Sequence, residues 1–297
     1  MSATNVIELA ATFSCDGDRL VGIVSLPQQP SRRGVLVVVG GPQYRAGSHR
    51  QFTLLCRGLA ASGIAAMRFD YRGMGDAEGE PRTFEDIDDD IRAAIDHFCA
   101  QVPGLSEVLI CGLCDAASAA MFYASSDPRV QGIVLINPWA RTTSGIAKAQ
   151  LRHYYGARLA DREFWQRLVH GEVAVGAALR SAAGVARAAL GAAASEPAVE
   201  AAERSPGPAS SSPATPLPER MADGLERFHG RVLLVRSGRD LTAQEFSDMA
   251  AASPRWRELL GASRTELRDL PDADHTFSRR EWRDQIVGWT AAWANSR

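Results

Sequence analysis

Short, continuous apolar runs alternate with helix-length segments along this chain, and no other feature limits its possible folds as much. The runs cover residues 34–39, 64–69, 108–111, 132–136 and 232–235, with a weaker one at 265–270. Continuous apolarity over about five residues is typical of strands covered on both faces. The alternation predicts a mostly parallel sheet with helices on both faces, and binding chemistry at the carboxyl ends of its strands.

The helix-length segments cover residues 48–62, 83–100, 115–125 and 279–294. In the second of these, "TFEDIDDDIRAAIDHF", acidic residues follow Thr83 and apolar residues recur on one face, which predicts an N-capped amphipathic helix beginning at Thr83. Alternating runs at about 6–15 and 20–26, separated by "DGD", predict an antiparallel hairpin before the parallel strands.

The alternation breaks at residues 139–228, where a helical, aromatic stretch is followed by an Ala-rich one and then by one rich in Pro, Ser and Ala. We interpret this block as a helical cap inserted between two parts of a core domain, residues 1–138 and 229–297. Residues 192–218 cannot bury enough apolar surface to offset their ordering entropy, so we expect a flexible loop there. The alternative, two domains joined by a linker, is disfavoured because the final segment, with two strands and one helix, is too small to fold independently.

Cys111 and Cys114, in "VLICGLCDAASAA", are open to three interpretations. A zinc knuckle needs a second pair of ligands, and the other cysteines are scattered singly with no His pair beside them, so we expect no metal. A redox dithiol needs both sulfurs at a helix N-terminus, whereas the apolar run places Cys111 inside a strand. The third interpretation is a nucleophile elbow with Cys114 in the position usual for Ser.

The elbow fits the residues around Cys114 well. A nucleophile on a sharp turn needs small neighbours, and Gly112 and Ala116 lie two residues before and after it. The helix that begins at Asp115 favours a thiolate and supplies the Asp115 N–H as an oxyanion donor, while the Asp115 carboxylate opposes the thiolate. We therefore expect a thiol that needs a base; a buried structural cysteine is the plainer alternative.

The elbow also predicts an acid after the next-to-last strand and a histidine after the last strand. Asp240 and His275 stand at these positions, and the other histidines precede a strand, lie in helical segments or belong to the loop after the first parallel strand. Asp272 and Asp274 are too near His275 in sequence to orient its ring, which makes Asp240 the preferred acid.

The loop after the first parallel strand, "VGGPQYRAGSHRQF", should supply the second oxyanion donor, for which we choose the Gln43 N–H. Arg45 and His49 of this loop are candidate substrate contacts, as are the aromatic residues Trp139 and Tyr154 of the cap. For each, a structural role is an equal or better explanation. The following "FDYRGMGD" loop lacks the glycine pattern of a dinucleotide site, so we assign no cofactor.

Charge and hydropathy exclude two classes of partner. The net charge of -2 and a pI near 6.3 give no basic patch for nucleic acid. No stretch approaches the ~20 apolar residues that span a bilayer. With no secretory signal pattern and an odd number of cysteines, five, we expect a cytoplasmic protein with free thiols.

Together, the motifs "VGGPQYRAGSHRQF", "FDYRGMGD", "FEDIDDDI", "GLCDAASA", "INPW" and "RHYY" resemble the α/β-hydrolase superfamily, and within it the exosortase A system-associated hydrolases of type 1. The resemblance covers nearly the whole chain except about residues 192–218. It implies an α/β-hydrolase fold with a cap, and a cytoplasmic bacterial hydrolase linked to exopolysaccharide biosynthesis, with no defined substrate. Dienelactone hydrolases also carry Cys at the elbow, but this chain differs in having a helical cap.

These observations predict a Cys114–His275–Asp240 triad that acts on an ester or thioester of a small molecule or an acyl carrier. An acyltransferase using the same triad is not separable from a hydrolase at this point. Two further alternatives stay open: a non-catalytic scaffold of polysaccharide assembly, and a redox role for Cys111 and Cys114. The oligomeric state is not defined by these features.

Overall fold

The computed structural model describes residues 6–41, 43–140 and 215–296. These belong almost entirely to one compact unit, built from Met1–Ala140 and Pro218–Arg297. Residues 141–214, which make up most of the expected cap and of its 192–218 loop, lie outside the described residues.

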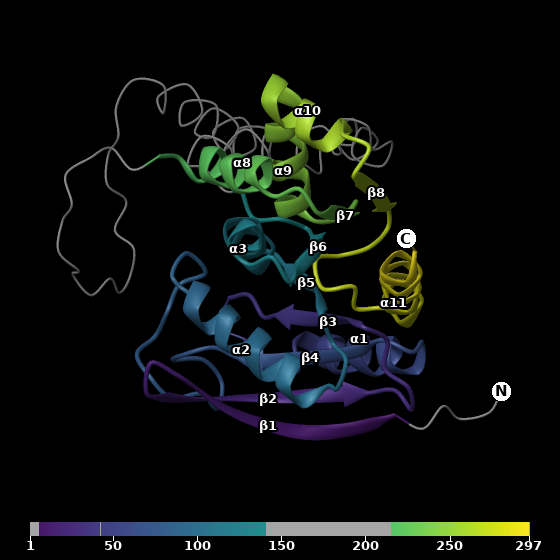
Figure 1. Ribbon diagram of the computed structural model, residues 1–297. Coiled ribbons are helices and arrows are strands. Elements are labelled where there is room, and N and C mark those ends of the chain that lie inside the picture. Colours follow the sequence, from purple (N-terminus) through teal and green to yellow (C-terminus); the bar gives the residue numbers. More distant parts are fainter. Residues whose placement is uncertain (1–5, 42, 141–214, 297) are drawn as a thin grey trace, which may run out of the picture. The chain divides into compact units, whose positions relative to one another are not determined.

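The described residues form one eight-stranded sheet with the order β1-β2-β4-β3-β5-β6-β7-β8 (Figure 1). Its strands are β1 (Ile7–Cys15), β2 (Asp18–Leu26), β3 (Arg33–Val38), β4 (Ala65–Asp70), β5 (Glu107–Leu113), β6 (Val130–Ile136), β7 (Arg231–Ser237) and β8 (Thr265–Leu270). β1 and β2 form the predicted antiparallel hairpin, and β2 also pairs antiparallel with β4. All pairs from β4 to β8 are parallel, which confirms the predicted fold class.

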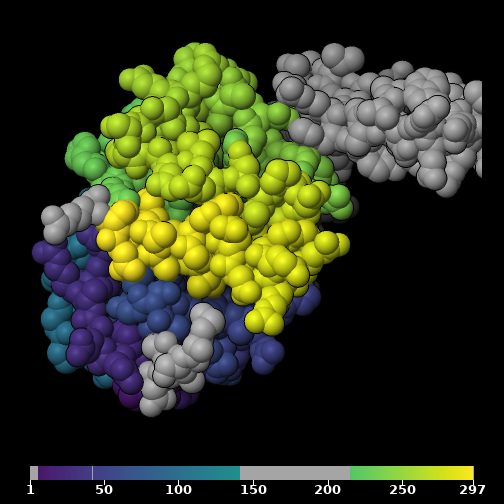
Figure 2. Space-filling model, turned by 90° about the vertical axis from the view of Figure 1, so that its right-hand side faces the viewer, coloured from purple at the N-terminus to yellow at the C-terminus, as the bar shows by residue number. Residues whose placement is uncertain are grey.

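Helices cover both faces of this sheet because its central strands are apolar on both sides. α1 (Gln51–Ala61), which follows the 3₁₀ turn η1 (Ser48–Arg50), and α11 (Arg280–Asn295) lie together on one face, over Val35, Val37 and Val134. In Figure 2 the yellow segment containing α11 lies against the blue segment containing α1. α2 (Asp88–Gln101) and α3 (Asp115–Tyr123), the latter followed by η2 (Ala124–Ser126), lie on the other face (Figure 1).

Three helices lie before and after β7. α8 (Leu217–Arg227) buries Met221, Ala222 and Leu225 completely, and its Gly224 approaches the backbone of α3 so closely that a Cβ would lie 2.2 Å from the Met121 carbonyl oxygen. α9 (Leu241–Ala252) and α10 (Pro254–Gly261) connect β7 to β8. The sequence prediction of only strands and a terminal helix after residue 228 was wrong, because it missed these two helices.

The predicted start of the second helix was also wrong. α2 begins at Asp88, five residues after Thr83, and it has no side-chain N-cap. The Thr83 carbonyl instead accepts a hydrogen bond from the Asp86 N–H at 3.0 Å, which forms a turn ahead of the helix. The first helical turn is fixed by Asp90, a fully buried carboxylate whose Oδ2 lies 2.9 Å from Nη2 of Arg72. This ion pair joins two segments distant in sequence, so local helix signals could not locate the boundary.

Within the residues that the structure describes, no helix combines the length and the apolar character needed to cross a membrane.

Candidate active site

Cys114 occupies the sharp turn between β5 and α3, where the elbow was expected. Its backbone has φ 64° and ψ −125°, a left-handed conformation that non-glycine residues seldom adopt. The Cys114 N–H donates to the Ile136 carbonyl at 2.9 Å, and its own carbonyl accepts from the Ala117 N–H at 3.1 Å. These bonds hold the strained residue at the carboxyl end of β5, with its side chain partly exposed.

Gly112 has no room for a side chain. A Cβ at this position would lie 2.4 Å from both the backbone carbon and the carbonyl oxygen of Ala116, and 2.6 Å from the Ala117 nitrogen. Ala116 itself is fully buried. The turn thus brings the first residues of α3 directly over the end of β5, and for that reason it needs small residues on both sides of Cys114.

The structure brings His275 and Asp240 together from loops 35 residues apart in sequence. His275 Nδ1 lies 2.8 Å from Asp240 Oδ2. Asp240, which is 6% exposed, also caps α9 by accepting hydrogen bonds from the amides of Thr242 and Ala243. These two amides fix the carboxylate in place, so it can orient the imidazole ring.

The two rival carboxylates face other partners. Asp272 pairs with Arg239 at 3.1 Å on the surface, and Asp274 accepts hydrogen bonds from the amide and hydroxyl of Ser278. Among the carboxylates of the described residues, Asp240 is therefore the one that the structure pairs with His275.

The surroundings of His275 favour its protonated form. Burial lowers the pKa of His275, but the interactions with Asp240 and Cys114 outweigh this effect and raise the pKa to about 10. A histidine between a buried carboxylate and a thiol is suited to hold a proton taken from that thiol.

The Asp115 carboxylate, at the start of α3, contacts the loop after β3 that was expected to bind the oxyanion. Its two oxygens accept hydrogen bonds from the Gly41 and Ala116 amides, both at 2.9 Å. A Cβ on Gly40 would lie 2.0 Å from one of these oxygens, so glycine is required there. Burial raises the pKa of Asp115 above its usual value, although the Gly41 and Ala116 amides oppose the shift. The Gln43 N–H, our chosen donor, is bonded to the Gly41 carbonyl at 2.8 Å.

A buried polar network that the sequence analysis did not assign supports the His275 loop. Asn137, fully buried at the end of β6 with φ 45°, donates from Nδ2 to the Ser237 hydroxyl at 2.9 Å and to the His275 carbonyl at 3.2 Å. The Ser237 N–H donates to Asn137 Oδ1, and the Ser237 hydroxyl donates to the Asp274 carbonyl. An asparagine directly after a buried strand was the available signal, but its partners are distant in sequence.

The four candidate substrate contacts have different positions. Arg45 is bound by Asp70 and Asp76 and lies over the Tyr44 ring, so it joins the loops after β3 and β4. His49 has a left-handed backbone and an exposed side chain. The Trp139 N–H donates to the Cys114 carbonyl at 3.1 Å, which places its backbone beside the elbow. Tyr154 lies outside the described residues.

The other cysteine of the motif, Cys111, is buried within the sheet. Cys111 is 1% exposed within β5, and burial raises the pKa of its thiol to about 12. A thiol in this setting is unreactive, which weighs against a redox pair with Cys114. In the part of the chain that the structure describes, no group of three or more His, Cys, Asp or Glu side chains could hold a metal ion.

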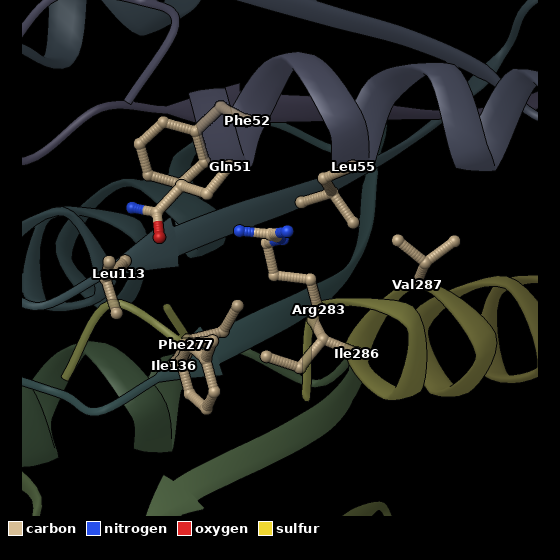
Figure 3. A pocket seen from close by; sticks show the side chains of 9 residues that line it. All are labelled: Gln51, Phe52, Leu55, Leu113, Ile136, Phe277, Arg283, Ile286 and Val287. Carbon is tan, nitrogen blue, oxygen red and sulfur yellow. The ribbon is translucent and has the colours of Figure 1, made fainter. Parts of the chain in front are cut away.

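An apolar pocket opens between α1, α11 and the ends of β5 and β6 (Figure 3). Leu113, directly before Cys114, and Phe277, two residues after His275, form part of its lining. Cys114 packs against the same core cluster that contains these two residues. The pocket is thus adjacent to the elbow and to the His275 loop.

Comparison with known proteins identifies the family and the fold. The alpha/beta hydrolase family model matches residues 35–287. The structure is similar to an esterase of Pyrococcus furiosus, with 12% identity over 97% of this chain and 90% of that chain and a TM-score of 0.61. It is also similar to Est1E from Butyrivibrio proteoclasticus, solved with ferulic acid bound, with 13% identity, 97% and 100% coverage and a TM-score of 0.61.

A third similar structure is an α/β serine hydrolase without lid from Xanthomonas campestris, with 17% identity, 98% and 96% coverage and a TM-score of 0.54. No curated protein matches this sequence. At these identities the structures establish the fold, and the family model covers most of the chain. The chain therefore belongs to the alpha/beta hydrolase family.

Proposed function

We propose that this protein is a cysteine-nucleophile hydrolase that cleaves an ester or thioester acyl substrate with Cys114, His275 and Asp240. The observation that carries the proposal is the coincidence of two features at one edge of the sheet. Cys114 has the strained backbone of a nucleophile elbow, and His275, whose pKa is raised by Asp240 and Cys114 together, lies with its Nδ1 2.8 Å from Asp240 Oδ2. A nucleophile, a base and a group that orients the base are what acyl transfer requires.

In the proposed reaction, the Cys114 thiol proton moves to His275 and the sulfur attacks the acyl carbon. The tetrahedral intermediate collapses, the bond to the leaving alcohol or thiol breaks, and His275 returns the proton to that leaving group. Water then attacks the thioester acyl-enzyme, with His275 accepting a proton from it, and the acid product and the free thiol are released. Asp240 keeps the imidazole ring oriented and stabilises its positive charge in both halves of the reaction.

The oxyanion is proposed to form near the amides of Gln43 and Asp115. In the described conformation the Gln43 N–H is bonded to the Gly41 carbonyl, and the Asp115 carboxylate accepts the Gly41 N–H. Use of the Gln43 amide therefore requires the loop after β3 to change conformation when substrate binds. This requirement predicts that the oxyanion site is complete only in the complex with substrate.

The biological setting follows from the resemblance of the motifs alone. We propose that the substrate is a small-molecule or carrier-bound acyl group linked to bacterial exopolysaccharide biosynthesis. A free-thiol nucleophile suits the reducing cytoplasm, and all five cysteines are free in the structure. An acceptor amine or alcohol in place of water would turn the same acyl-enzyme into an acyltransferase.

The proposal is tested with a panel of aryl esters and thioesters, comparing the wild-type protein with Cys114→Ala, His275→Gln and Cys99→Ser. Cys99 is a partly exposed thiol on α2 and serves as the matched control. We expect hydrolysis to be abolished in the first two variants and retained in the third, with the acyl group found on Cys114 by mass spectrometry. Unchanged hydrolysis by Cys114→Ala, or no hydrolysis of any substrate by the wild type, would contradict the proposal.

A further inference from the structure

The apolar pocket beside the elbow contains two polar side chains, and both have hydrogen-bond donors that no acceptor among the described residues uses. Seven lining residues are apolar: Phe52, Leu55, Leu113, Ile136, Phe277, Ile286 and Val287. The other two are Gln51, at the start of α1, and Arg283, in the first turns of α11. Figure 3 shows the Gln51 amide and the Arg283 guanidinium extending into the same space.

Gln51 is 8% exposed, yet its buried Nε2 has no hydrogen-bond partner among the described residues. Burial of an amide without a partner is unfavourable, so this Nε2 lacks an acceptor that a group bound in the pocket would supply. The apolar walls of the pocket supply no side-chain acceptor for it.

Arg283 has a similar surplus of donors. Its Nη1 donates to the Ser278 carbonyl at 3.1 Å, and within the described part of the chain no carboxylate forms an ion pair with it. A guanidinium presents five N–H donors, so this one bond leaves most of its capacity, and all of its charge, unmatched. The pocket therefore has a positive charge beside apolar walls, which complements a carboxylate at the end of a hydrocarbon chain.

The position of the pocket indicates which part of a substrate would enter it. Leu113 and Phe277 belong both to its lining and to the cluster on which Cys114 packs. An acyl group attached to Cys114 can thus extend over these two side chains towards α1 and α11. The donors of Gln51 and Arg283 would meet the far end of such a chain.

We infer that the pocket binds the acyl part of the substrate and that this acyl chain ends in a carboxylate, which makes the substrate a half-ester or half-thioester of a dicarboxylic acid. This inference rests on the proposed function, because it takes Cys114 as the point of attachment. The carboxylate accepts hydrogen bonds from the Gln51 amide and the Arg283 guanidinium, and the methylene groups lie against Leu113, Phe277 and Ile286.

The test compares aryl thioesters matched in chain length, with and without the terminal carboxylate: succinyl against butyryl, glutaryl against valeryl, and adipyl against hexanoyl. After correction for spontaneous hydrolysis, we expect kcat/KM to favour the carboxylate of the best-fitting pair by roughly 10- to 100-fold, the usual effect of a hydrogen bond to a charged group. Arg283→Gln and Gln51→Leu should each lower this ratio.

Arg280→Gln is the matched control, since Arg280 begins the same helix but is exposed and pairs with Asp284 on the surface. It should keep the wild-type ratio, and Arg283→Lys should keep part of it because the charge remains. Neutral chains hydrolysed as fast as their carboxylate partners, by a reaction that depends on Cys114, would overturn the pocket assignment and leave the hydrolase proposal standing.

A binding measurement separates the two claims if no thioester is hydrolysed. Calorimetric titration of glutarate into folded Cys114→Ala protein, and into the same protein carrying Arg283→Gln, reports on the pocket without turnover. Binding lost with Arg283 would support the pocket while the hydrolase proposal fails. An absence of binding in both proteins would overturn the inference.

Discussion

Replacement of Gly112 by alanine tests the geometry on which the nucleophile depends. The new Cβ would lie 2.4 Å from two backbone atoms of Ala116 and 2.6 Å from the Ala117 nitrogen, and none of these can rotate away. Relief requires the first turn of α3 to move away from β5. Overpacking of this kind costs about 1–3 kcal/mol, and we expect the upper end because the contacts are with backbone.

The matched control is Gly288→Ala. Gly288 lies within α11, and a Cβ there has no atom within 4 Å, so alanine should stabilise the protein by ~0.5–1 kcal/mol through its helix propensity. Urea unfolding followed by circular dichroism gives both free energies of unfolding, and iodoacetamide labelling gives the reactivity of Cys114. A Gly112→Ala protein within ~0.5 kcal/mol of the wild type, with equal Cys114 reactivity, would refute the reasoning.

Three further predictions concern the residues around His275. Asp240→Asn keeps an N-cap acceptor for α9, so we expect its free energy of unfolding, measured in urea, to fall only slightly. Its hydrolysis rate should drop about 100-fold or more, because the asparagine no longer orients and charges the imidazole ring. A loss of stability large enough to account for the lost rate would contradict the orienting role. Because the fold raises the pKa of His275 from 6.5 to about 10, the stability that the imidazolium contributes is fully present below about pH 6.5 and is lost as the pH rises through 10. The stability of the wild type relative to His275→Gln should therefore decline between pH 7 and 10, and a constant difference would count against the shift. Asn137→Ala removes the hydrogen bonds to Ser237 and to the His275 carbonyl and places alanine at φ 45°. We expect its free energy of unfolding in urea to fall by about 3 kcal/mol. A fall of less than ~1 kcal/mol would show that this network is unimportant.

The sheet and the elbow were predictable because their signals are local. Five or six apolar residues in a row mark a strand buried on both faces, and the run from Val108 followed by Gly112 and Cys114 marks a sharp turn into a helix. The position of each strand in the chain then indicated where an acid and a histidine should stand. Helices α9 and α10 were missed, although Asp240 as the N-cap of α9, and Ser253 followed by Pro254 at the start of α10, were available signals.

The remaining features depend on contacts between distant segments. The Arg72–Asp90 ion pair sets the start of α2 from a loop 18 residues away. The hydrogen bond from the Gly41 amide to the Asp115 carboxylate joins residues 74 apart. Neither sequence motif therefore indicated that this carboxylate binds the loop after β3. Gln51 and Arg283 meet in one pocket only because α1 and α11 pack together.

The central claim is that Cys114 is a nucleophile activated by His275. Its most direct test is intact-mass spectrometry after a small dose of iodoacetamide over a pH series, applied to the native wild type and to His275→Ala. We predict a single fast label on Cys114 that slows when His275 is removed. Labelling of Cys114 no faster than that of an ordinary exposed thiol, and unchanged in His275→Ala, would contradict the account.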